Sequence, residues 1–431
     1  MSLRAPAIPL PEAATDRLRS VQVRPFGLYL HVPFCATRCG YCDFNTYTAG
    51  ELGSSTSPAA WAEAVRRELD RAAELLRPER PVETIFVGGG TPSLLGADGL
   101  ADLLGAVRRS FDLAPGAEVT TESNPESTSP EFFAGLREAG YTRISLGMQS
   151  AAPHVLQILE RRHTPGRALA AAREAAAAGF EHLNLDLIYG TPGETDDDLA
   201  ASLDAVLSVP VDHVSAYALI VEDGTAFARK VRRGEVPMPD DDVLAARYEQ
   251  INARLSEAGL TWYEVSNWAR AEGDVRFPAS SSTSPPAEPG DAGARVEASP
   301  RPAPRSVCRH NEAYWRSDDW WGIGPGAHSH VNGVRWWNQK HPATYSASLD
   351  AGSLPVGGFE ILSDDDVHTE QVMLRLRMRS GLPTTELAPD EMRRAERAVA
   401  DGLLRIDDGV YVLTDPGRLL ADGVIRDILV D

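Results

Sequence analysis

Three of the four cysteines in the chain lie close together, and their spacing could hold a metal site. They are Cys35, Cys39 and Cys42, separated by three and by two residues. Three thiolates in one loop suit an iron–sulfur cluster or zinc. A closed structural zinc site needs a fourth ligand, for which His31 and Cys308 are the candidates. A cluster on three cysteines would instead leave one iron open for chemistry, and we favour that interpretation over zinc and over redox-active thiols.

Glycines and polar side chains recur where short apolar runs end, which is typical of a small-molecule site. The run at residues 83–87 is followed by a glycine-rich loop, namely Gly88, Gly89, Gly90 and Thr91. The loop lacks the Gly-Lys-Ser/Thr ending of a phosphate-binding loop, so it is either a tight turn or a place where backbone approaches a ligand closely. The other polar candidates are Glu122, Gln149, Arg161 and Asp186. Asp186 is the clearest, because a carboxylate within an apolar strand is costly unless it has a partner.

Six short strands alternating with six helices must position these residues. The strands are predicted at residues 27–32, 83–87, 117–121, 143–147, 182–187 and 213–219. The helices are predicted at residues 59–76, 99–110, 130–139, 167–178, 196–207 and 241–258. Consecutive strand–helix units indicate a parallel sheet, either open and doubly wound or curved and barrel-like. In both forms ligands bind at the carboxyl ends of the strands, where the candidate residues fall.

The chain beyond residue 272 departs from this pattern. Pro, Ala, Ser, Gly and Thr fill 21 of the 27 positions from 278 to 304, which predicts a disordered insertion. A stretch rich in Trp, Gly and His follows, and then two helices, a hairpin turning at Asp408-Gly409 and a last helix suggest a small winged-helix-like module. The predicted ranges are 308–345 for the stretch, 367–380 and 390–401 for the helices, 404–413 for the hairpin and 416–430 for the last helix. We therefore divide the chain into a flexible N-terminus (1–23), an α/β domain (24–272), the insertion (273–305) and a C-terminal domain (306–431).

Length and charge exclude several classes of protein. The chain has 431 residues, and 42 Lys and Arg against 62 Asp and Glu give a net charge of −20. This acidity argues against nucleic-acid binding, which needs a basic face. Four cysteines at this length do not form a disulfide framework. The sequence shows neither a signal peptide nor an apolar run that could span a membrane, so we expect a soluble protein of the reducing cytoplasm.

The cysteine spacing directly after the first strand of a sixfold strand–helix repeat resembles the radical SAM superfamily. The resemblance implies a partial (β/α)6 TIM-like barrel with a [4Fe-4S] cluster on Cys35, Cys39 and Cys42. It implies that S-adenosylmethionine (SAM) binds the open iron, with Tyr41 beside the adenine. The further SAM contacts that it implies are Tyr29, Gly88, Gly89, Gly90, Thr91, Glu122, Gln149, Arg161 and Asp186.

Longer motifs are similar to the oxygen-independent coproporphyrinogen III oxidase group. They are Leu-Tyr-Leu-His-Val-Pro-Phe-Cys at 28–35, Gly-Gly-Gly-Thr-Pro-Ser at 88–93 and Asp-Leu-Ile-Tyr-Gly at 186–190. The decarboxylating oxidases of this group carry another cysteine two residues after the third cluster cysteine, where this chain has Phe44. The sister subgroup, the HemW heme chaperones, lacks that cysteine and carries a His-Asn-x-x-Tyr-Trp motif, which is His310–Trp315 here.

The resemblance thus implies a heme chaperone that binds heme and transfers it to apo-hemoproteins, with the oxidase as the alternative. His310 is the candidate heme contact, with aromatic neighbours for the porphyrin face in Tyr314, Trp315, Trp320 and Trp321. Equally, His310 could be hydrogen-bonded inside a Trp-rich lid, and Cys308 could be a second ligand or an inert buried thiol. His328 is a weaker candidate. Contact with membrane-bound recipients would be peripheral, and a homodimer is compatible with the sequence.

Overall fold

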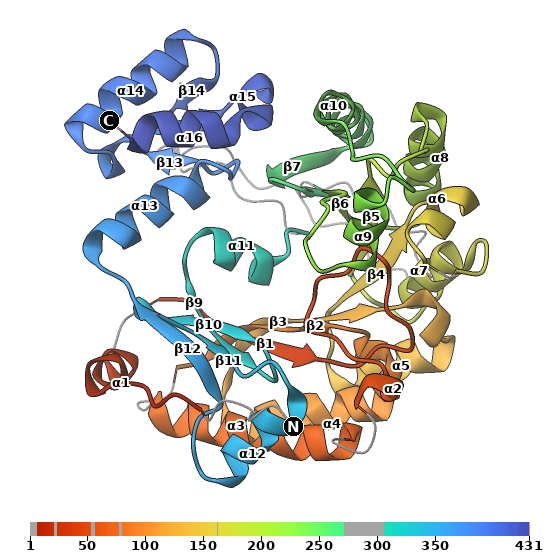
Figure 1. Ribbon diagram of the computed structural model, residues 1–431, viewed down its shortest axis with the longest axis vertical. Helices are drawn as coiled ribbons and strands as arrows, with labels where there is room; N and C mark the ends of the chain where they lie inside the picture. The colour runs from red at the N-terminus through yellow and green to blue at the C-terminus, as the bar shows by residue number, and fades with distance from the viewer. Residues whose placement is uncertain are drawn as a thin grey trace, which may run out of the picture.

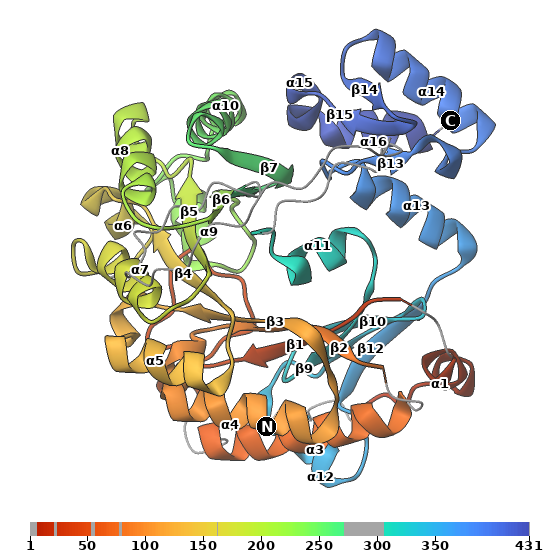
Figure 2. The same ribbon diagram turned by 180° about the vertical axis from the view of Figure 1, so that it is seen from behind.

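A twelve-stranded sheet organises the protein. The structure is a computed structural model, and it describes residues 7–20, 24–52, 57–76, 80–161, 163–270 and 306–430. Six neighbouring parallel strands follow one another in chain order at its centre. They are β1 (Phe26–Val32), β2 (Val82–Gly89), β3 (Leu113–Ser123), β4 (Arg143–Gln149), β5 (His182–Tyr189) and β6 (His213–Ala218). Figures 1 and 2 show these strands wrapping into a partial barrel with helices on the outside, which confirms the predicted fold class.

The helices that connect the strands cover the outer face of the barrel. They are α3 (Pro58–Leu75), α4 (Gly96–Ser110), α5 (Pro130–Ala139), α7 (Arg167–Ala177), α8 (Asp196–Leu207) and α10 (Asp241–Glu257), close to their predicted ranges. Four of them begin at a residue whose side chain accepts a backbone N–H of the first turn, namely Ser57, Ser129, Thr195 and Asp240. Shorter helical segments lie between the strands and these helices, at α2 (Ala49–Leu52), η1 (Pro92–Leu95), η2 (Pro125–Ser127), α6 (Pro153–Ile158) and α9 (Ala226–Arg232).

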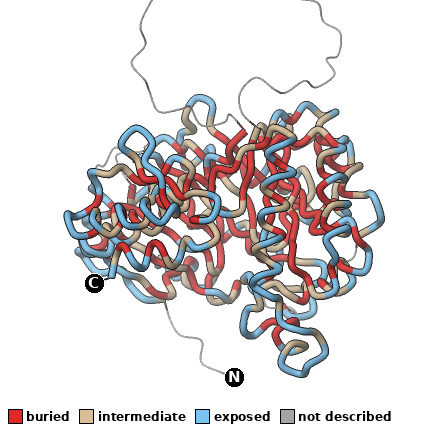
Figure 3. The backbone as a smooth tube through the Cα atoms, turned by 90° about the horizontal axis from the view of Figure 1, so that it is seen from above, coloured by how far each residue is buried: buried red, intermediate tan, exposed pale blue. Residues whose placement is uncertain are grey.

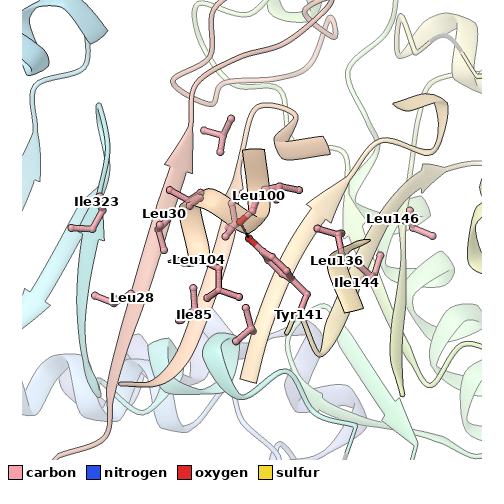
Figure 4. Close-up of a cluster of buried hydrophobic side chains, with 14 of the residues drawn as sticks. Leu28, Leu30, Ile85, Leu100, Leu104, Leu136, Tyr141, Ile144, Leu146 and Ile323 are labelled. Atoms are coloured by element: carbon pink, nitrogen blue, oxygen red, sulfur yellow. Dashed lines mark hydrogen bonds between the residues drawn. The ribbon is translucent and has the colours of Figure 1, made fainter. Parts of the chain in front are cut away.

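Aliphatic side chains of the strands pack between the helices and the sheet, as Figure 4 shows around Leu28, Ile85 and Ile144. In the same cluster the Tyr141 hydroxyl donates to the carbonyl of Leu100 at 2.9 Å, so this buried phenol has its partner. Figure 3 shows the buried residues concentrated along the interior of the molecule and the exposed ones on its outer turns.

The sheet continues on both sides of the six parallel strands, where no strand was predicted. On one edge β8 (Asn267–Arg270) and β7 (Leu260–Glu264) add antiparallel strands. On the other edge β9 (Asp319–Ile323) lies parallel to β1, and three antiparallel strands follow it: β10 (His328–Val331), β11 (Val334–Asn338) and β12 (Val356–Ile361). Helix α11 (Arg309–Trp315) lies inside the curve of the sheet in both views, and α12 (Pro342–Asp350) packs on α3.

A small module with its own core forms the C-terminal end. It contains α13 (Asp364–Arg375), β13 (Leu382–Pro383), η3 (Thr384–Glu386), α14 (Pro389–Ala400), β14 (Leu404–Asp407), β15 (Val410–Leu413), α15 (Asp415–Leu419) and α16 (Ala421–Leu429). The hairpin turns at Asp408 and Gly409 as predicted, both with positive φ. The predicted last helix is interrupted at Leu420. The predicted C-terminal domain begins at residue 306, whereas the structure has residues 319–361 in the main sheet and the separate core only from Val372 onward.

Of the two segments that were predicted to be flexible, the structure describes residues of the N-terminal one only. Helix α1 (Glu12–Arg19) lies within the predicted flexible N-terminus, and its Ala14 and Leu18 are buried against the main core. The predicted disordered insertion at 273–305 lies outside the described residues. Within the described ranges, no helix is long and apolar enough to cross a membrane.

Candidate functional site

The three clustered cysteines line a cavity of about 1110 Å³ at the carboxyl ends of the parallel strands, which we call the cluster cavity. The two ends of the loop that carries them are joined, because the backbone N–H of Cys35 donates to the carbonyl of Tyr47 at 3.0 Å. A turn between Cys39 and Cys42 is closed by a backbone hydrogen bond of 3.3 Å. Parallel strands bring their carboxyl ends to one edge of a sheet, so the cavity lies where the sequence predicted it.

The donor set around this loop fits an iron–sulfur cluster. Burial raises the pKa of the Cys35 and Cys42 thiols, so a bound cation is needed to hold them as thiolates at neutral pH. Arg161 donates to the Cys39 sulfur at 3.4 Å, and Thr91 to the Cys35 sulfur at 3.8 Å. No three His, Cys, Asp or Glu side chains among the described residues are arranged to hold one metal ion. A cluster has a different requirement, because each thiolate binds a separate iron.

Neither residue that could complete a zinc site does so. The ring nitrogens of His31 lie 3.0 Å from the Tyr29 hydroxyl and 2.9 Å from the Asn45 carbonyl oxygen. Cys308 is buried beside Glu118, with 3.6 Å between its sulfur and the carboxylate, and it does not line the cluster cavity. Both side chains are therefore engaged away from the three clustered thiols.

The glycine-rich loop allows β2 to end directly against the cysteine loop. A Cβ on Gly90 would lie 2.5 Å from the Phe34 carbonyl oxygen and 3.0 Å from the Cys35 sulfur. Gly89 has a φ of 111°, a conformation that favours glycine, and its N–H donates to the Glu122 carboxylate at 3.0 Å. The close approach predicted from the sequence is therefore an approach of two protein loops, with the cavity beside them.

Two half-buried carboxyl groups, those of Glu122 and Asp186, lie beneath this loop. Burial, reinforced by the nearby Asp186, raises the pKa of Glu122 to about 8. Burial also raises the pKa of Asp186, although Asn184 at 2.7 Å and Ser145 at 3.1 Å donate hydrogen bonds to it. Carboxyl groups with raised pKa values in a cavity are typical of a functional site. Both would gain from a cationic ligand.

The structure brings most of the predicted SAM contacts together in the cluster cavity. Its lining includes Tyr41, Gly89, Gly90, Thr91, Glu122, Gln149, Arg161 and Asp186. Gln149 ends β4 with a positive φ of 69°, where the register with β5 shifts, and this local distortion turns the chain at the cavity. Two predicted contacts lie elsewhere. Tyr29 lines a neighbouring cavity, and Gly88 lines neither, although a Cβ there would meet the Glu122 carboxylate at 3.0 Å.

That neighbouring cavity, the second cavity, has a volume of about 920 Å³ and was not predicted. It adjoins the cluster cavity, since Phe44, Gly89 and Glu122 line both. Strand β10 contributes His328 and His330, and Trp320 of β9 lies beside them. Phe44 is 59% exposed although it is aromatic, so the position that distinguishes the two subgroups lies open between the two cavities.

His310, the predicted heme contact, lies in the interior instead. Its exposed fraction is 1%, and it lines neither cavity. Its ring nitrogens lie 2.8 Å from the Thr84 hydroxyl and 2.8 Å from the Tyr314 hydroxyl, and its ring stacks on Phe86. Trp321 is also fully buried, whereas Tyr314 and Trp320 line the second cavity. In this conformation His310 holds α11 against the barrel, and its role as a heme contact remains a prediction.

Comparison with known proteins agrees with this arrangement. The Radical SAM superfamily pattern matches residues 29–206, and that of the HemN C-terminal domain matches residues 362–420. The chain is 57% identical to a protein named Heme chaperone HemW from Mycobacterium tuberculosis, and the similarity covers 94% of this chain and 95% of the relative. The chain belongs to the HemW family. The Heme chaperone HemW of Escherichia coli is 30% identical, with 94% of this chain and 98% of the relative covered.

This HemW-family chain has the same fold as one solved oxidase structure. Coproporphyrinogen III oxidase (HemN) from Escherichia coli has a solved structure that matches with a TM-score of 0.78, covering 97% of this chain and 93% of that one. The identity is 21%, so this likeness concerns the fold alone. Membership of the radical SAM superfamily implies a [4Fe-4S] cluster and SAM, and the cluster cavity of this HemW-family chain offers the side chains for both.

Sequence reasoning missed the second cavity because its walls come from strands that were not predicted. Met373 of α13 and Lys340 between β11 and α12 line it together with the β10 histidines, and of these four residues only His328 was a candidate, the weaker one. A signal was available in the His-Ser-His alternation at 328–330, which puts two imidazoles on one face of a strand.

Proposed function

We propose that this chain is a heme chaperone, which binds heme and transfers it to apo-hemoproteins. The observation that carries the proposal is its 57% identity, over 94% of the chain, to a protein named Heme chaperone HemW. The second cavity supports it, because a space of about 920 Å³ beside two histidines and several aromatic side chains suits a planar iron-bearing ligand.

The cluster cavity would hold the [4Fe-4S] cluster on Cys35, Cys39 and Cys42. Carboxyl groups of Glu122 and Asp186 lie where a cationic methionyl or ribose-bearing ligand such as SAM would use them. The cluster supplies one-electron chemistry when it is bound. The contribution of the chain is to position the ligand between the glycine-rich loop and the strand ends and to keep water from it.

The residue at position 44 argues against the alternative, an oxidase that decarboxylates coproporphyrinogen III. The oxidases resembled by this chain carry a cysteine there, whereas Phe44 has no thiol and stands exposed between the two cavities. Chemistry that needs a second reactive sulfur next to the cluster therefore lacks its residue in this chain.

Heme titration of the reconstituted protein tests the proposal. We expect a saturable change in heme absorption, followed by transfer of the heme to an added apo-hemoprotein. The same preparation is assayed anaerobically with reductant, SAM and coproporphyrinogen III, beside an active oxidase, and SAM cleavage is measured in parallel. Absence of heme binding, or formation of protoporphyrinogen at the rate of the oxidase control, would overturn the proposal.

The recipients and the location of the protein remain predictions. We propose apo-hemoproteins as partners, with membrane-bound ones met through peripheral contact. A cytoplasmic location, a homodimer and the absence of nucleic-acid binding are likewise proposed from the sequence alone. Light scattering of the purified protein with and without heme would measure the oligomeric state directly.

A further inference from the structure

The histidines of the described chain differ in whether their ring nitrogens are available. His31 and His310 each have both ring nitrogens within hydrogen-bond distance of a partner. His330 is buried, and one of its nitrogens lies 3.2 Å from the Asp318 carbonyl oxygen. The ring nitrogens of His328 have no hydrogen-bond partner within the described part of the chain, and the residue is exposed. Of the three histidines that line the second cavity, His328 alone presents both nitrogens.

The His328 ring is nevertheless held in place. It stacks on Trp337 of β11 with 5.9 Å between ring centroids and 27° between the planes. The two residues are directly paired across the antiparallel strands β10 and β11, and the His328 carbonyl accepts a hydrogen bond from the Trp320 indole at 3.0 Å. A ring that is fixed on one face and has free nitrogens at a cavity wall has the properties of a metal ligand.

The residues around His328 offer an apolar wall for the ring of a heme and a cation for a propionate. Trp320, Met373 and Leu374 give the cavity an apolar wall, while Phe44 stands exposed at the boundary with the cluster cavity. Lys340 is exposed at the same cavity, and its ammonium forms no ion pair within the described ranges. The other cations at this cavity already have partners, since Arg38 pairs with Glu51 and Arg335 pairs with Glu360 and Glu370. One cation is thus left for a carboxylate such as a heme propionate.

We propose that heme occupies the second cavity with His328 as its axial ligand and Lys340 on a propionate. The inference rests on the proposed heme-chaperone function and assigns its binding site. It places the heme beside the loop that carries the cluster, on the far side of Phe44 from the SAM pocket. Tyr314 at the cavity wall accepts or donates a hydrogen bond with the interior His310, so the His310–Trp315 motif supports the wall without contacting iron.

The neutral state of the imidazole agrees with this assignment. Burial, with Lys340 and Arg335 adding to it, lowers the pKa of His328. Glu360, which lies across β11, opposes the shift. An unprotonated ring nitrogen is therefore available at neutral pH, as iron ligation requires.

Heme titration of the reconstituted full chain tests the assignment, with absorption and electron paramagnetic resonance as readouts. His328→Ala should weaken heme binding by about tenfold or more and shift the Soret band. Added imidazole should restore the wild-type spectrum, which loss of packing alone would not allow. Lys340→Ala should weaken binding less and leave the band position unchanged. SAM binding and iron content should stay unaltered in both variants.

Two further histidine variants complete the design. His154→Ala, on the outer helix α6, is the matched control and should behave as the wild type. His310→Gln keeps hydrogen-bonding capacity in the interior and should retain the wild-type Soret band. The inference is overturned if His328→Ala binds heme with the wild-type spectrum, or if only His310→Gln loses the ligand signature. Failure of the wild-type protein to bind heme would instead overturn the proposed function.

Discussion

The cluster cavity and the second cavity adjoin, yet they are built in different ways. The cluster cavity lies at the ends of parallel strands and offers thiols, the Arg161 guanidinium and the half-buried carboxyl groups of Glu122 and Asp186. The second cavity is walled in part by strands β9 and β10 and by α13, and it offers imidazoles, a thioether and indole. Phe44 and Glu122 line both.

This difference indicates that two cavities of one scaffold recognise two kinds of ligand. Charged and soft ligand atoms serve a cluster and a polar cationic nucleoside, whereas flat apolar surfaces and neutral nitrogen donors serve a planar metal complex. The two sets belong to different strands of one sheet, so substitutions should disable one and spare the other.

The largest effect is expected when a cluster ligand is removed. Cys39→Ser should abolish the [4Fe-4S] cluster, because two cysteines cannot hold it, while heme affinity should stay within about threefold of the wild type. Iron and sulfide analysis after anaerobic reconstitution measures the first effect, and heme titration the second. Cys308→Ser is the matched control, since that thiol is buried beside Glu118 and should not alter iron content. Joint loss of cluster and heme in Cys39→Ser would refute the independence of the two cavities.

A smaller change at Gly90 should also disturb the cluster cavity. In Gly90→Ala the new Cβ would lie 2.5 Å from the Phe34 carbonyl oxygen, so the cysteine loop has to move and cluster content should fall by half or more. Gly50→Ala is the control, because a Cβ at Gly50 meets nothing within 4 Å. Iron per protein chain is the measurement. Equal iron content in the two variants would show that the close approach of the two loops is not needed.

The parallel half of the fold could be predicted because each unit repeats one local pattern. Strand β4 alternates Ile144, Leu146 and Met148 with polar residues and glycine, and the connecting helix α7 buries alanines at helical spacing, so periodicity alone locates both. Strands β9 to β11 have only four or five residues each, which is too short for their Trp, Gly and His composition to establish a period. Strand β9 pairs with β1 after a long interval of chain, and β10 and β11 add to it in turn, so no local pattern encodes their place in the sheet.

The candidate site divides in the same way. Residues at the ends of predicted strands, such as Glu122 and Asp186, could be assigned to one cavity because parallel strands end at a common edge. The motif that contains His310 could be found in the sequence, but its burial inside the barrel could not, because α11 is placed by Thr84 and Phe86 of β2.

Removing the charge of Asp186 should weaken the SAM side alone. Asp186→Asn replaces an acceptor of hydrogen bonds from Ser145 and Asn184 with a group that also donates, and it removes a negative charge from the cavity. We expect SAM affinity to fall by about tenfold and heme affinity to stay unchanged, as equilibrium dialysis would measure. Asp212→Asn is the control, because this buried carboxylate pairs with His182 and lines neither cavity. Equal SAM affinity in both variants would exclude Asp186 as a SAM contact.

The smallest effect concerns stability, at Glu122, a carboxyl group that lines both cavities. The pKa of Glu122 is about 8 in the folded chain against an ordinary value of 4.5, so between these pH values the folded state holds a proton that the unfolded state lacks. The free energy of unfolding therefore falls as pH rises through this window. Glu122→Gln has no such proton, so it should match the wild type near pH 5 and be more stable by about 1–2 kcal/mol near pH 9.

Urea unfolding of the cluster-free protein at several pH values measures this difference in the free energy of unfolding. Glu118→Gln is expected to change the free energy of unfolding in the opposite direction. Burial opposes ionisation of Glu118, but the Arg143 guanidinium outweighs it and the pKa of Glu118 is lowered. Its replacement should therefore destabilise the protein at neutral and alkaline pH, since it leaves a buried guanidinium without its partner. If the difference in the free energy of unfolding between Glu122→Gln and the wild type does not grow with pH, the Glu122 carboxyl is already ionised in the absence of a ligand. Its negative charge would then attract a cation to both cavities.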